Sequence, residues 1–388
     1  MIFKDRDKLS PRYIPEFLPH REEQIKLLKD FLWDSLRNPS KSYSKVLQLI
    51  GDVGSGKTVT TVRFGEMFQN EGRKRKINLK HVYLNPKVHG ASRIILYRYL
   101  VQEATPEVFS ANLNAEELLI ELMKHLQSTK KYLLISFDEA DYFVKHSKES
   151  AIYALTRLDE VLPGKPTNVL GVILTARSTK FHEKLDRAEL STLGTFLIRF
   201  NSYNSREIFD ILETRVNEAF LPKVVTTDVL EYIADVTSKP PVNGDVRYAL
   251  DLLLYSGILA SNYGAEVVSL EHARRVMSMI HYSITDEDII NLSDKGKIVL
   301  LAIARALRSA KNPYVSLRDI RSMCSLICED HKLKAIDEIE EYVQDLADRD
   351  IVDIKSLTSI GISRVPMEDL EKFLEGLMER IRIDVNDK

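Results

Sequence analysis

Residues 51–58 read Gly-Asp-Val-Gly-Ser-Gly-Lys-Thr and match the phosphate-binding loop pattern G-x-x-x-x-G-K-[ST]. The apolar run Val46–Ile50 precedes this loop, and a segment with apolar residues at helical spacing follows it. Such a loop needs a buried strand before it and a helix after it, because backbone N–H groups and the helix N-terminus must face the phosphates. The pattern therefore predicts a nucleotide-binding α/β fold.

Each position of this loop has an expected part in binding ATP or ADP. Lys57 supplies positive charge, Thr58 offers its hydroxyl to Mg²⁺, and the helix that follows adds its dipole. The residues of this stretch that we expect to contact the nucleotide are Gly51, Val53, Gly54, Ser55, Gly56, Lys57, Thr58 and Val59.

A second apolar run, Tyr132–Phe137, ends in the acidic pair Asp138 and Glu139. We expect Asp138 to hold Mg²⁺ together with Thr58, and Glu139 to orient or deprotonate the attacking water. A whole strand–helix unit separates the pair from the loop. That spacing and the glutamate favour ATP hydrolysis over phosphate transfer to a small molecule, as in a P-loop kinase.

Strand and helix patterns alternate through the first half of the chain, which predicts a parallel sheet covered on both faces. Strands are expected at 46–50, 81–85, 132–137, 168–175 and 195–200, and helices at 22–36, 92–103, 115–128 and 151–162. Because the chain has 388 residues, we expect two or three domains.

No strand pattern continues after Tyr203. Helical patterns at 205–216, 227–236, 244–263 and 269–280 predict a small helical domain. Helices at 295–307, 316–328 and 334–348, with a hairpin from 351–355 and 360–364, predict a winged helix-turn-helix. The expected domains are a nucleotide-binding α/β domain at 1–203, a helical lid at 204–284 and a winged-helix domain at 285–388.

Composition narrows the class of protein further. No apolar run reaches the roughly 18–20 residues that cross a membrane, and the N-terminal residues lack the apolar core of a signal peptide. We therefore expect a cytoplasmic protein with no membrane partner. The net charge of −2 means that any contact with nucleic acid must come from local basic patches.

Two arginines are candidates for contact with the γ-phosphate. Arg247, in Gly244-Asp245-Val246-Arg247, opens a helix and could report whether the nucleotide is ATP or ADP; it could equally be a solvated arginine. Arg187 lies between the fourth and fifth expected strands. It could act on a neighbouring subunit as an arginine finger, or it could be a surface arginine.

Over nearly its whole length the chain resembles the archaeal origin-recognition and cell-division-control initiator family of AAA+ ATPases. The likeness rests on Tyr13-Ile14-Pro15, Pro19-His20-Arg21-Glu22, both nucleotide motifs, the segment 244–247 and the C-terminal unit. It implies that Arg247 is the lid sensor and Arg187 the finger. It also implies that the entry segment with Tyr13, Ile14, His20 and Arg21 lies against the adenine, with Tyr203 and Ile211 on its other side.

The resemblance also implies the partners: double-stranded origin DNA, the replicative minichromosome-maintenance helicase and sister initiator proteins. The segment 85–98 matches the initiator-specific insertion, so Lys87, His89 and Arg93 are expected to contact the DNA backbone. The helix expected at 334–348 has an acidic outer face that would repel phosphate. We therefore expect the C-terminal contacts from Lys332, Lys334, Lys355 and Arg364, or else a hairpin used for protein contact.

The chain departs from the family at the end of the fourth strand, where a polar sensor, typically asparagine, is usual. Here Ala176 falls at that position, and Thr175 or Arg177 could substitute. We expect slow ATP hydrolysis and a nucleotide held as a long-lived conformational switch. The alternative function is an AAA+ or STAND-like ATPase that regulates transcription or transposition.

Overall fold

The structure is a computed structural model of the whole chain. It describes residues 2–108, 112–147, 151–162, 164–165, 167–239, 242–269, 272–273, 276, 279, 286–310, 315–331, 333–349, 351–362 and 370–378. The chain divides into two compact units, Met1–Val276 and Met277–Lys388, which are described separately. None of the described helices is both long and apolar enough to cross a membrane.

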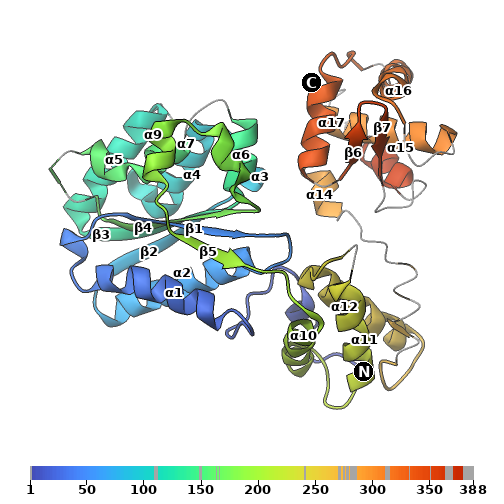
Figure 1. Cartoon of the computed structure of the whole chain (residues 1–388), viewed down its shortest axis with the longest axis horizontal. Helices are drawn as coiled ribbons and strands as arrows, with labels where there is room; N and C mark the ends of the chain where they lie inside the picture. Colours follow the sequence, from blue (N-terminus) through green and yellow to red (C-terminus); the bar gives the residue numbers. More distant parts are fainter. Residues whose placement is uncertain are drawn as a thin grey trace. The chain divides into compact units, whose positions relative to one another are not determined.

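A parallel five-stranded sheet forms the centre of the first unit, in the order β2-β3-β4-β1-β5 (Figure 1). The strands are β1 (Lys45–Gly51), β2 (Asn78–Leu84), β3 (Lys131–Phe137), β4 (Val169–Ala176) and β5 (Leu197–Phe200). The predicted parallel sheet is confirmed, although β2 begins earlier than expected. Because all strands run the same way, the segments that follow β1, β3 and β4 meet at one edge of the sheet.

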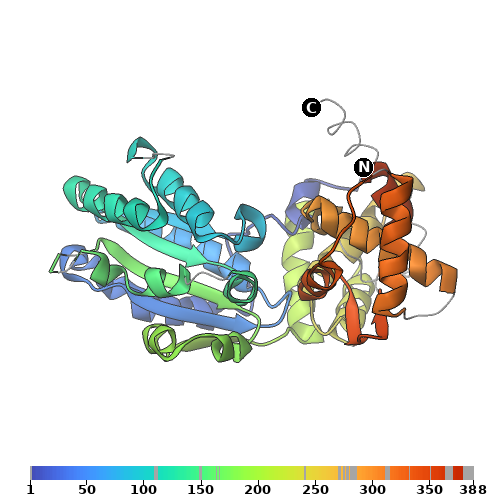
Figure 2. The same cartoon turned by 90° about the horizontal axis from the view of Figure 1, so that it is seen from above.

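Helices cover both faces of this sheet (Figure 1; Figure 2). On one face lie α1 (Glu22–Leu32) and α2 (Lys57–Lys74), and on the other α4 (Arg93–Ala104), α5 (Ala115–Thr129), α6 (Ala140–His146), α7 (Ala151–Thr156), α8 (Leu158–Val161) and α9 (Arg187–Thr192). The predicted helix 151–162 is thus two short helices. Leu28, Leu32, Phe64 and Phe68 fill the first face, because each has less than a hundredth of its surface exposed.

Short elements connect these layers. They are the α-helix α3 (Pro86–His89) and the 3₁₀ helices η2 (Trp33–Leu36), η3 (Pro39–Lys41), η4 (Pro106–Val108) and η5 (Thr179–Lys184). The predicted helix 22–36 therefore changes to a 3₁₀ turn after Leu32.

The lid consists of α10 (Ser205–Ala219), α11 (Thr227–Ser238) and α12 (Val246–Asn262). The start of the chain packs against it: Lys4 N–H donates to Ala219 O at 2.8 Å, and the rings of Phe3 and Phe220 lie 4.7 Å apart. The 3₁₀ helix η1 (Arg6–Leu9) follows this contact. The fourth expected helix, 269–280, falls largely outside the described residues.

The second unit has a core of its own, formed by helices and a hairpin. Its elements are α14 (Asp286–Ile290), α15 (Asp294–Ala310), α16 (Leu317–Asp330), α17 (Ile339–Asp348) and the antiparallel strands β6 (Asp353–Ser356) and β7 (Ser359–Gly361). The expected order of three helices and a hairpin is present, and the additional short helix α14 precedes it.

The helix α17 begins at Ile339 rather than at Lys334 as predicted. Acidic side chains are favoured at a helix N-terminus, and Glu340 and Glu341 occupy its first turn. The inner face of this segment is apolar, because Ile336, Ile339, Val343 and Leu346 are buried.

Candidate nucleotide-binding site

Two glycines shape the loop between β1 and α2. Gly54 and Gly56 have φ angles of 72° and 87°, a left-handed conformation that side chains rarely adopt. A Cβ atom on Gly54 would lie 2.0 Å from Asp245 Oδ1, and one on Gly56 would lie 2.6 Å from Tyr203 Oη. The start of the lid therefore packs directly against the loop, and only glycine fits at either position.

Lys57 lies at the first position of α2, where its ammonium contacts the loop itself. Its Nζ donates to Gly51 O at 2.6 Å and to Asp52 O at 2.8 Å. Burial lowers the pKa of Lys57, while the negative charges of Glu139 and Asp138 oppose that shift. The lysine is thus held in the loop, at the position expected for phosphate binding.

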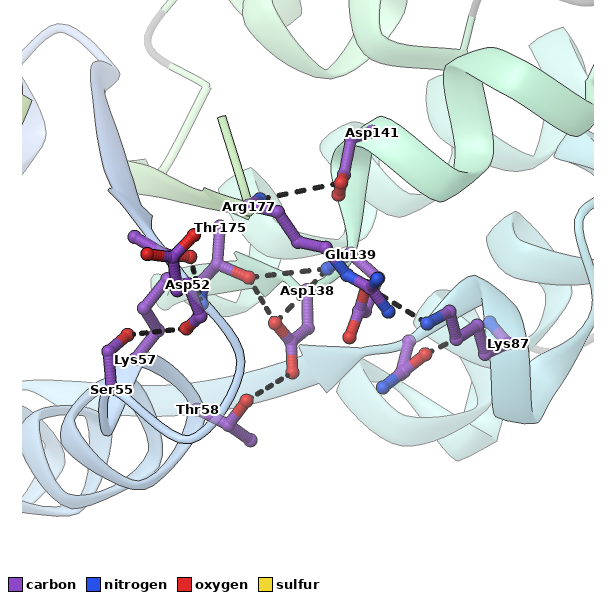
Figure 3. Close-up of polar contacts among 12 residues, drawn as sticks. Asp52, Ser55, Lys57, Thr58, Lys87, Asp138, Glu139, Asp141, Thr175 and Arg177 are labelled. Carbon is purple, nitrogen blue, oxygen red and sulfur yellow. Dashed lines mark hydrogen bonds and ion pairs between the residues drawn. The ribbon is translucent and has the colours of Figure 1, made fainter. Parts of the chain in front are cut away.

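Asp138 follows β3 and accepts hydrogen bonds from several segments (Figure 3). Thr58 Oγ1 donates to its Oδ2 at 2.8 Å, and the Tyr83 hydroxyl donates to the same oxygen. Thr175 Oγ1 and Glu139 N–H donate to Oδ1, the latter at 3.1 Å. The structure therefore brings the two expected magnesium ligands together. Tyr83 was missed by the sequence analysis, although its strand pairs with β3.

These groups fit Mg²⁺ by the chemistry of their donors. Asp138 is only 3% exposed, and its carboxylate accepts hydrogen bonds at both oxygens. Thr58 and Asp138 offer only oxygen ligands, which Mg²⁺ prefers. We assign them as the residues that would hold the ion.

Glu139 caps α6 with a φ of 52°, an uncommon value for a residue with a side chain. Its Oε2 lies 3.2 Å from Lys87 Nζ and 3.9 Å from Arg177 Nε (Figure 3). Burial favours the neutral acid, but the two cations outweigh it and lower the pKa of Glu139. The expected catalytic glutamate is therefore ionised and paired.

At the end of β4, Ala176 takes the position where the family usually has a polar sensor residue. Ala176 pairs in register with Ile50 and is buried, with 2% exposure, in the apolar core. Its two neighbours instead reach the acidic pair, Thr175 through its hydrogen bond to Asp138 and Arg177 through its contact with Glu139. The polar groups at this strand end therefore contact the carboxylates.

Arg21 is buried and joins the entry segment to the loop. Its Nε donates to Ser55 O and its Nη2 to Asn201 O, both at 2.9 Å. Its guanidinium lies 3.7 Å from the centre of the Tyr203 ring. Burial lowers the pKa of Arg21. The resemblance placed Arg21 and Tyr203 on opposite sides of an adenine, whereas in this structure they contact each other.

The other residues expected near the adenine connect the entry segment to the lid. His20 Nε2 lies 2.8 Å from Asp210 Oδ2 of α10, and the Tyr13 ring lies 4.9 Å from the Arg215 guanidinium of the same helix. Ile211 is buried in α10, and Ile14 and Val59 are half-buried, as is Val53 in the loop.

The two candidate arginines differ in their surroundings. Arg247 is exposed in the first turn of α12, where its N–H donates to Asp245 Oδ1 at 2.9 Å, and its charge contributes to the lowered pKa of Lys57. It is therefore close to the phosphate loop. Arg187 is exposed at the start of α9, and among the described residues no hydrogen bond or ion pair is recorded for it.

The residues expected to contact DNA from the insertion are engaged within the first unit. His89 stacks on Tyr99 with ring centres 3.8 Å apart, Arg93 Nη2 lies 2.7 Å from Glu116 Oε1, and Lys87 contacts Glu139. In the second unit Lys334 is exposed. Lys332, Arg364 and the side chain of Lys355 lie outside the described residues.

Part of the acidic face of α17 is neutralised by neighbouring arginines. Glu340 forms an ion pair with Arg321 of α16, and Asp345 lies 2.9 Å from Arg349 Nε. The face is therefore less repulsive toward phosphate than its sequence suggests.

Family models match both parts of the first unit. An AAA domain matches residues 40–185, and a Cdc6 AAA+ ATPase-type lid domain matches residues 209–278. The ORC1-type DNA replication protein 2 of Saccharolobus solfataricus is 32% identical over 321 residues, which cover 82% of this chain and 77% of that protein. The chain belongs to the archaeal ORC1-type family of DNA replication proteins.

Other members of the ORC1-type family align over almost the whole chain. The protein of Pyrococcus furiosus is 29% identical over 99% of this chain and 87% of its own length. The ORC1 protein of Aeropyrum pernix, solved in complex with DNA, superposes with a TM-score of 0.79 at 25% identity, covering 97% of each chain. This ORC1-type chain is thus an AAA+ ATPase, whose sheet and helical lid form the site for ATP and ADP.

Proposed function

We propose that this ORC1-type protein is an ATP-dependent initiator of DNA replication. It binds double-stranded origin DNA and helps to recruit the replicative minichromosome-maintenance helicase, within the cytoplasm and on the nucleoid. The observation that supports this best is the likeness over 97% of both chains to the Aeropyrum pernix ORC1 protein, which was solved in complex with DNA. In this proposal the nucleotide-binding domain ends at residue 203 and the lid ends at residue 284.

ATP binds against the loop, and its phosphates are held by Lys57 and the loop N–H groups. Mg²⁺, when bound by Thr58 and Asp138, neutralises phosphate oxygens. Asp245 and Tyr203 pack against the loop glycines. A conformational change of the loop therefore shifts the residues at the start of the lid. ATP and ADP can thereby favour different lid positions, which makes the nucleotide a switch.

Hydrolysis is slow in this proposal. Glu139 orients the attacking water, but two cations occupy its Oε2. Arg247, in the lid, contacts the γ-phosphate. Arg187, exposed on α9, acts as an arginine finger only when it contacts the nucleotide bound to a sister initiator.

The C-terminal unit acts as a winged helix on DNA. Lys334 lies just before α17, and Lys332, Lys355 and Arg364 complete the basic set around the hairpin. The insertion adds Lys87, His89 and Arg93, of which Arg93 must exchange Glu116 for a phosphate. These contacts are mainly to backbone phosphates, so bending of the DNA contributes to specificity.

Footprinting of the purified protein on genomic fragments, with ATP and with ADP, tests the proposal. Discrete protected sites near replication starts, with extents that differ between the two nucleotides, are expected. The Lys57→Ala variant should give the same pattern with both nucleotides. Protection confined to promoters would instead support the transcription regulator.

A further inference from the structure

A glutamine interrupts the apolar strand that leads into the phosphate loop. Gln48 lies in the middle of β1 and is only 2% exposed, between the buried residues Leu47 and Leu49. A buried amide is unfavourable unless its donors and its acceptor find partners. The hydrogen bonds of Gln48 therefore show which part of the chain its side chain holds in place.

The partners of this side-chain amide lie in the segment that joins β4 to β5. Gln48 Nε2 donates to Gly194 O at 2.9 Å and to Leu193 O at 3.3 Å, and its Oε1 lies 2.7 Å from His182 Nε2. Carbonyl oxygens only accept hydrogen bonds, so the amide nitrogen faces them and Oε1 faces the histidine. His182 therefore donates through Nε2, and the amide uses both of its donors and its acceptor.

These contacts lie on both sides of α9, the short helix that begins at Arg187. His182 belongs to η5, before the helix, and Gly194 follows its end. Gly194 has a φ of 70°, which strains a residue with a side chain, and a Cβ atom on it would lie 3.4 Å from Val46 O of β1. The strand β1 thus holds both ends of the segment 182–194.

Further contacts fix α9 itself. Asp186 caps the helix by accepting from Glu189 N–H at 2.7 Å, and Glu189 Oε2 accepts in return from Asp186 N–H at 3.0 Å. Thr192 Oγ1 lies 2.7 Å from Thr156 Oγ1 of α7. Arg187 is exposed on this helix, so the backbone of the segment determines where its guanidinium can reach.

An arginine that acts on the nucleotide of another copy must be presented in a fixed position. A misplacement of about 1 Å can lower a rate by about 10²-fold. Gln48 supplies such a restraint from β1, the strand that ends at Gly51 in the phosphate loop. The same strand therefore carries the loop of one copy and holds the segment that presents Arg187 to the next.

We propose that Gln48, together with His182, is a positioning residue that fixes the direction in which Arg187 points toward a neighbouring copy. The inference rests on the finger role of Arg187 in the proposed function and adds the residues on which that role depends. Gln48 acts through the segment 182–194 and on the neighbour's nucleotide. Removing its amide should therefore slow hydrolysis by the neighbour and leave the nucleotide site of its own copy unchanged.

Hydrolysis in mixtures of two full-length variants, on a long genomic duplex that several copies can occupy, tests the inference. The acceptor, Arg187→Ala, lacks the finger, and the donor, Glu139→Gln, keeps the finger but lacks the glutamate that orients water. The donor should raise the kcat of the acceptor, and adding Gln48→Met to the donor should reduce that increase at least about tenfold. The same substitution in the acceptor should change kcat and KM less than about twofold.

Variants at two other positions provide the controls. His182→Leu in the donor should act like Gln48→Met, whereas His182→Gln, which can still donate to Gln48, should retain most of the increase. Gln24→Met is the matched control, because the Gln24 amide donates to Arg199 O of β5 at 3.3 Å, outside the segment 182–194. It should leave the donor fully effective.

Hydrogen exchange measures the position of the segment directly. The amides of Leu190 and Leu193 donate to Asp186 O and Glu189 O within α9. In Gln48→Met, whose side chain has a similar volume, these amides should exchange at least about tenfold faster, while those of α2 and α10 should keep their rates.

The outcomes separate this inference from the role on which it rests. A Gln48→Met donor as effective as the intact donor, or unchanged exchange in α9, overturns the inference alone. A donor that also carries Arg187→Ala gives the rate without any finger. If that donor matches the intact one, the finger role in the proposed function is refuted, and the inference with it.

Discussion

Single side chains connect the parts of this nucleotide site that the backbone leaves separate. Arg21 reaches the loop through Ser55 O, the strand-to-lid connection through Asn201 O, and the lid through the Tyr203 ring. A guanidinium can make these contacts together because its N–H groups diverge in one plane. Arg21 therefore sets the position of the loop relative to the lid.

Replacing Arg21 by alanine should weaken ATP binding by about tenfold and destabilise the protein by about 2–4 kcal/mol, since the buried Ser55 carbonyl and the partly buried Asn201 carbonyl lose their donor. Titration with a fluorescent ATP analogue and urea unfolding measure the two effects. Arg21→Lys should recover only part of the ATP affinity and of the stability, because an ammonium cannot reproduce the planar set of N–H donors of a guanidinium. The control Arg37→Ala removes an arginine that is 75% exposed and should change neither. Tight ATP binding by Arg21→Ala would contradict this role.

His81, on β2, packs on Gly65 of α2 and lies 2.8 Å from Ser136 Oγ. Burial lowers the pKa of His81 from 6.5 to about 4. Between these values the unfolded chain binds a proton that the folded protein does not, so stability is complete at pH 7 and falls as the pH drops toward 4.

At pH 5 this group should cost about 2 kcal/mol of the free energy of unfolding relative to pH 7. Trp33 is the only tryptophan and packs on Phe64 and Phe68, so its fluorescence reports on this part of the first unit during urea unfolding. In His81→Gln, the free energy of unfolding should fall by about 2 kcal/mol less between pH 7 and pH 5 than in the wild type. An equal pH dependence in the two proteins would rule out the histidine as the cause.

At the scale of elements, the loop and the start of α12 are built to fit each other. Gly54 can hold no Cβ, since Asp245 Oδ1 and Cα would lie 2.0 Å and 2.6 Å away. Asp245 also caps α12 by accepting from Arg247 N–H. Asp245 therefore contacts both the loop, at Gly54, and the backbone of Arg247, and so connects the sheet to the lid.

Gly54→Ala should consequently disrupt this contact and lower ATP affinity by at least about tenfold, with a loss of about 2 kcal/mol or more in stability. Gly164→Ala is a matched control: Gly164 has a similar φ of 76° but nothing within 4 Å of its Cβ position. That variant has the backbone strain without the clash and should bind ATP normally. Calorimetry with ATP distinguishes the two, and equal affinities would refute the contact argument.

The sequence predicted those elements that a local pattern determines. The loop and the acidic pair were located because their spacing is fixed by phosphate and magnesium chemistry. The contact of Lys87 with Glu139 could not be predicted, because it depends on how α3 lies against α6. The break within 151–162 and the late start of α17 are likewise boundary effects that apolar periodicity does not specify.

At the scale of the whole molecule, the sequence predicted three parts, while the folded chain forms two compact units. The sheet and the lid belong to one unit because the first residues, such as Phe3, pack on the lid and Arg21 joins the loop to it. Such contacts join residues far apart in sequence and have no local signal. ATP binding and lid position are thus properties of one unit, whereas the proposed contact of the second unit with DNA depends on that unit's own basic residues.

Lys334 tests the role of the second unit in DNA binding. It is exposed just before α17, and a lysine that neutralises one phosphate contributes about one unit to the slope of log K against log salt. Lys334→Ala should therefore lower that slope by about one, and weaken binding equally on origin and unrelated duplexes. Fluorescence anisotropy over a series of salt concentrations measures both quantities.

Lys372→Ala is the control for this measurement. Lys372 is also exposed in the second unit, but it lies in the helical segment 370–378, far from Lys334 in the sequence. Its removal changes the net charge equally, so a general electrostatic effect would alter both variants alike. A slope reduced only in Lys334→Ala assigns the phosphate contact to the approach of α17. Equal slopes in the wild type and Lys334→Ala would rule out a phosphate contact by Lys334.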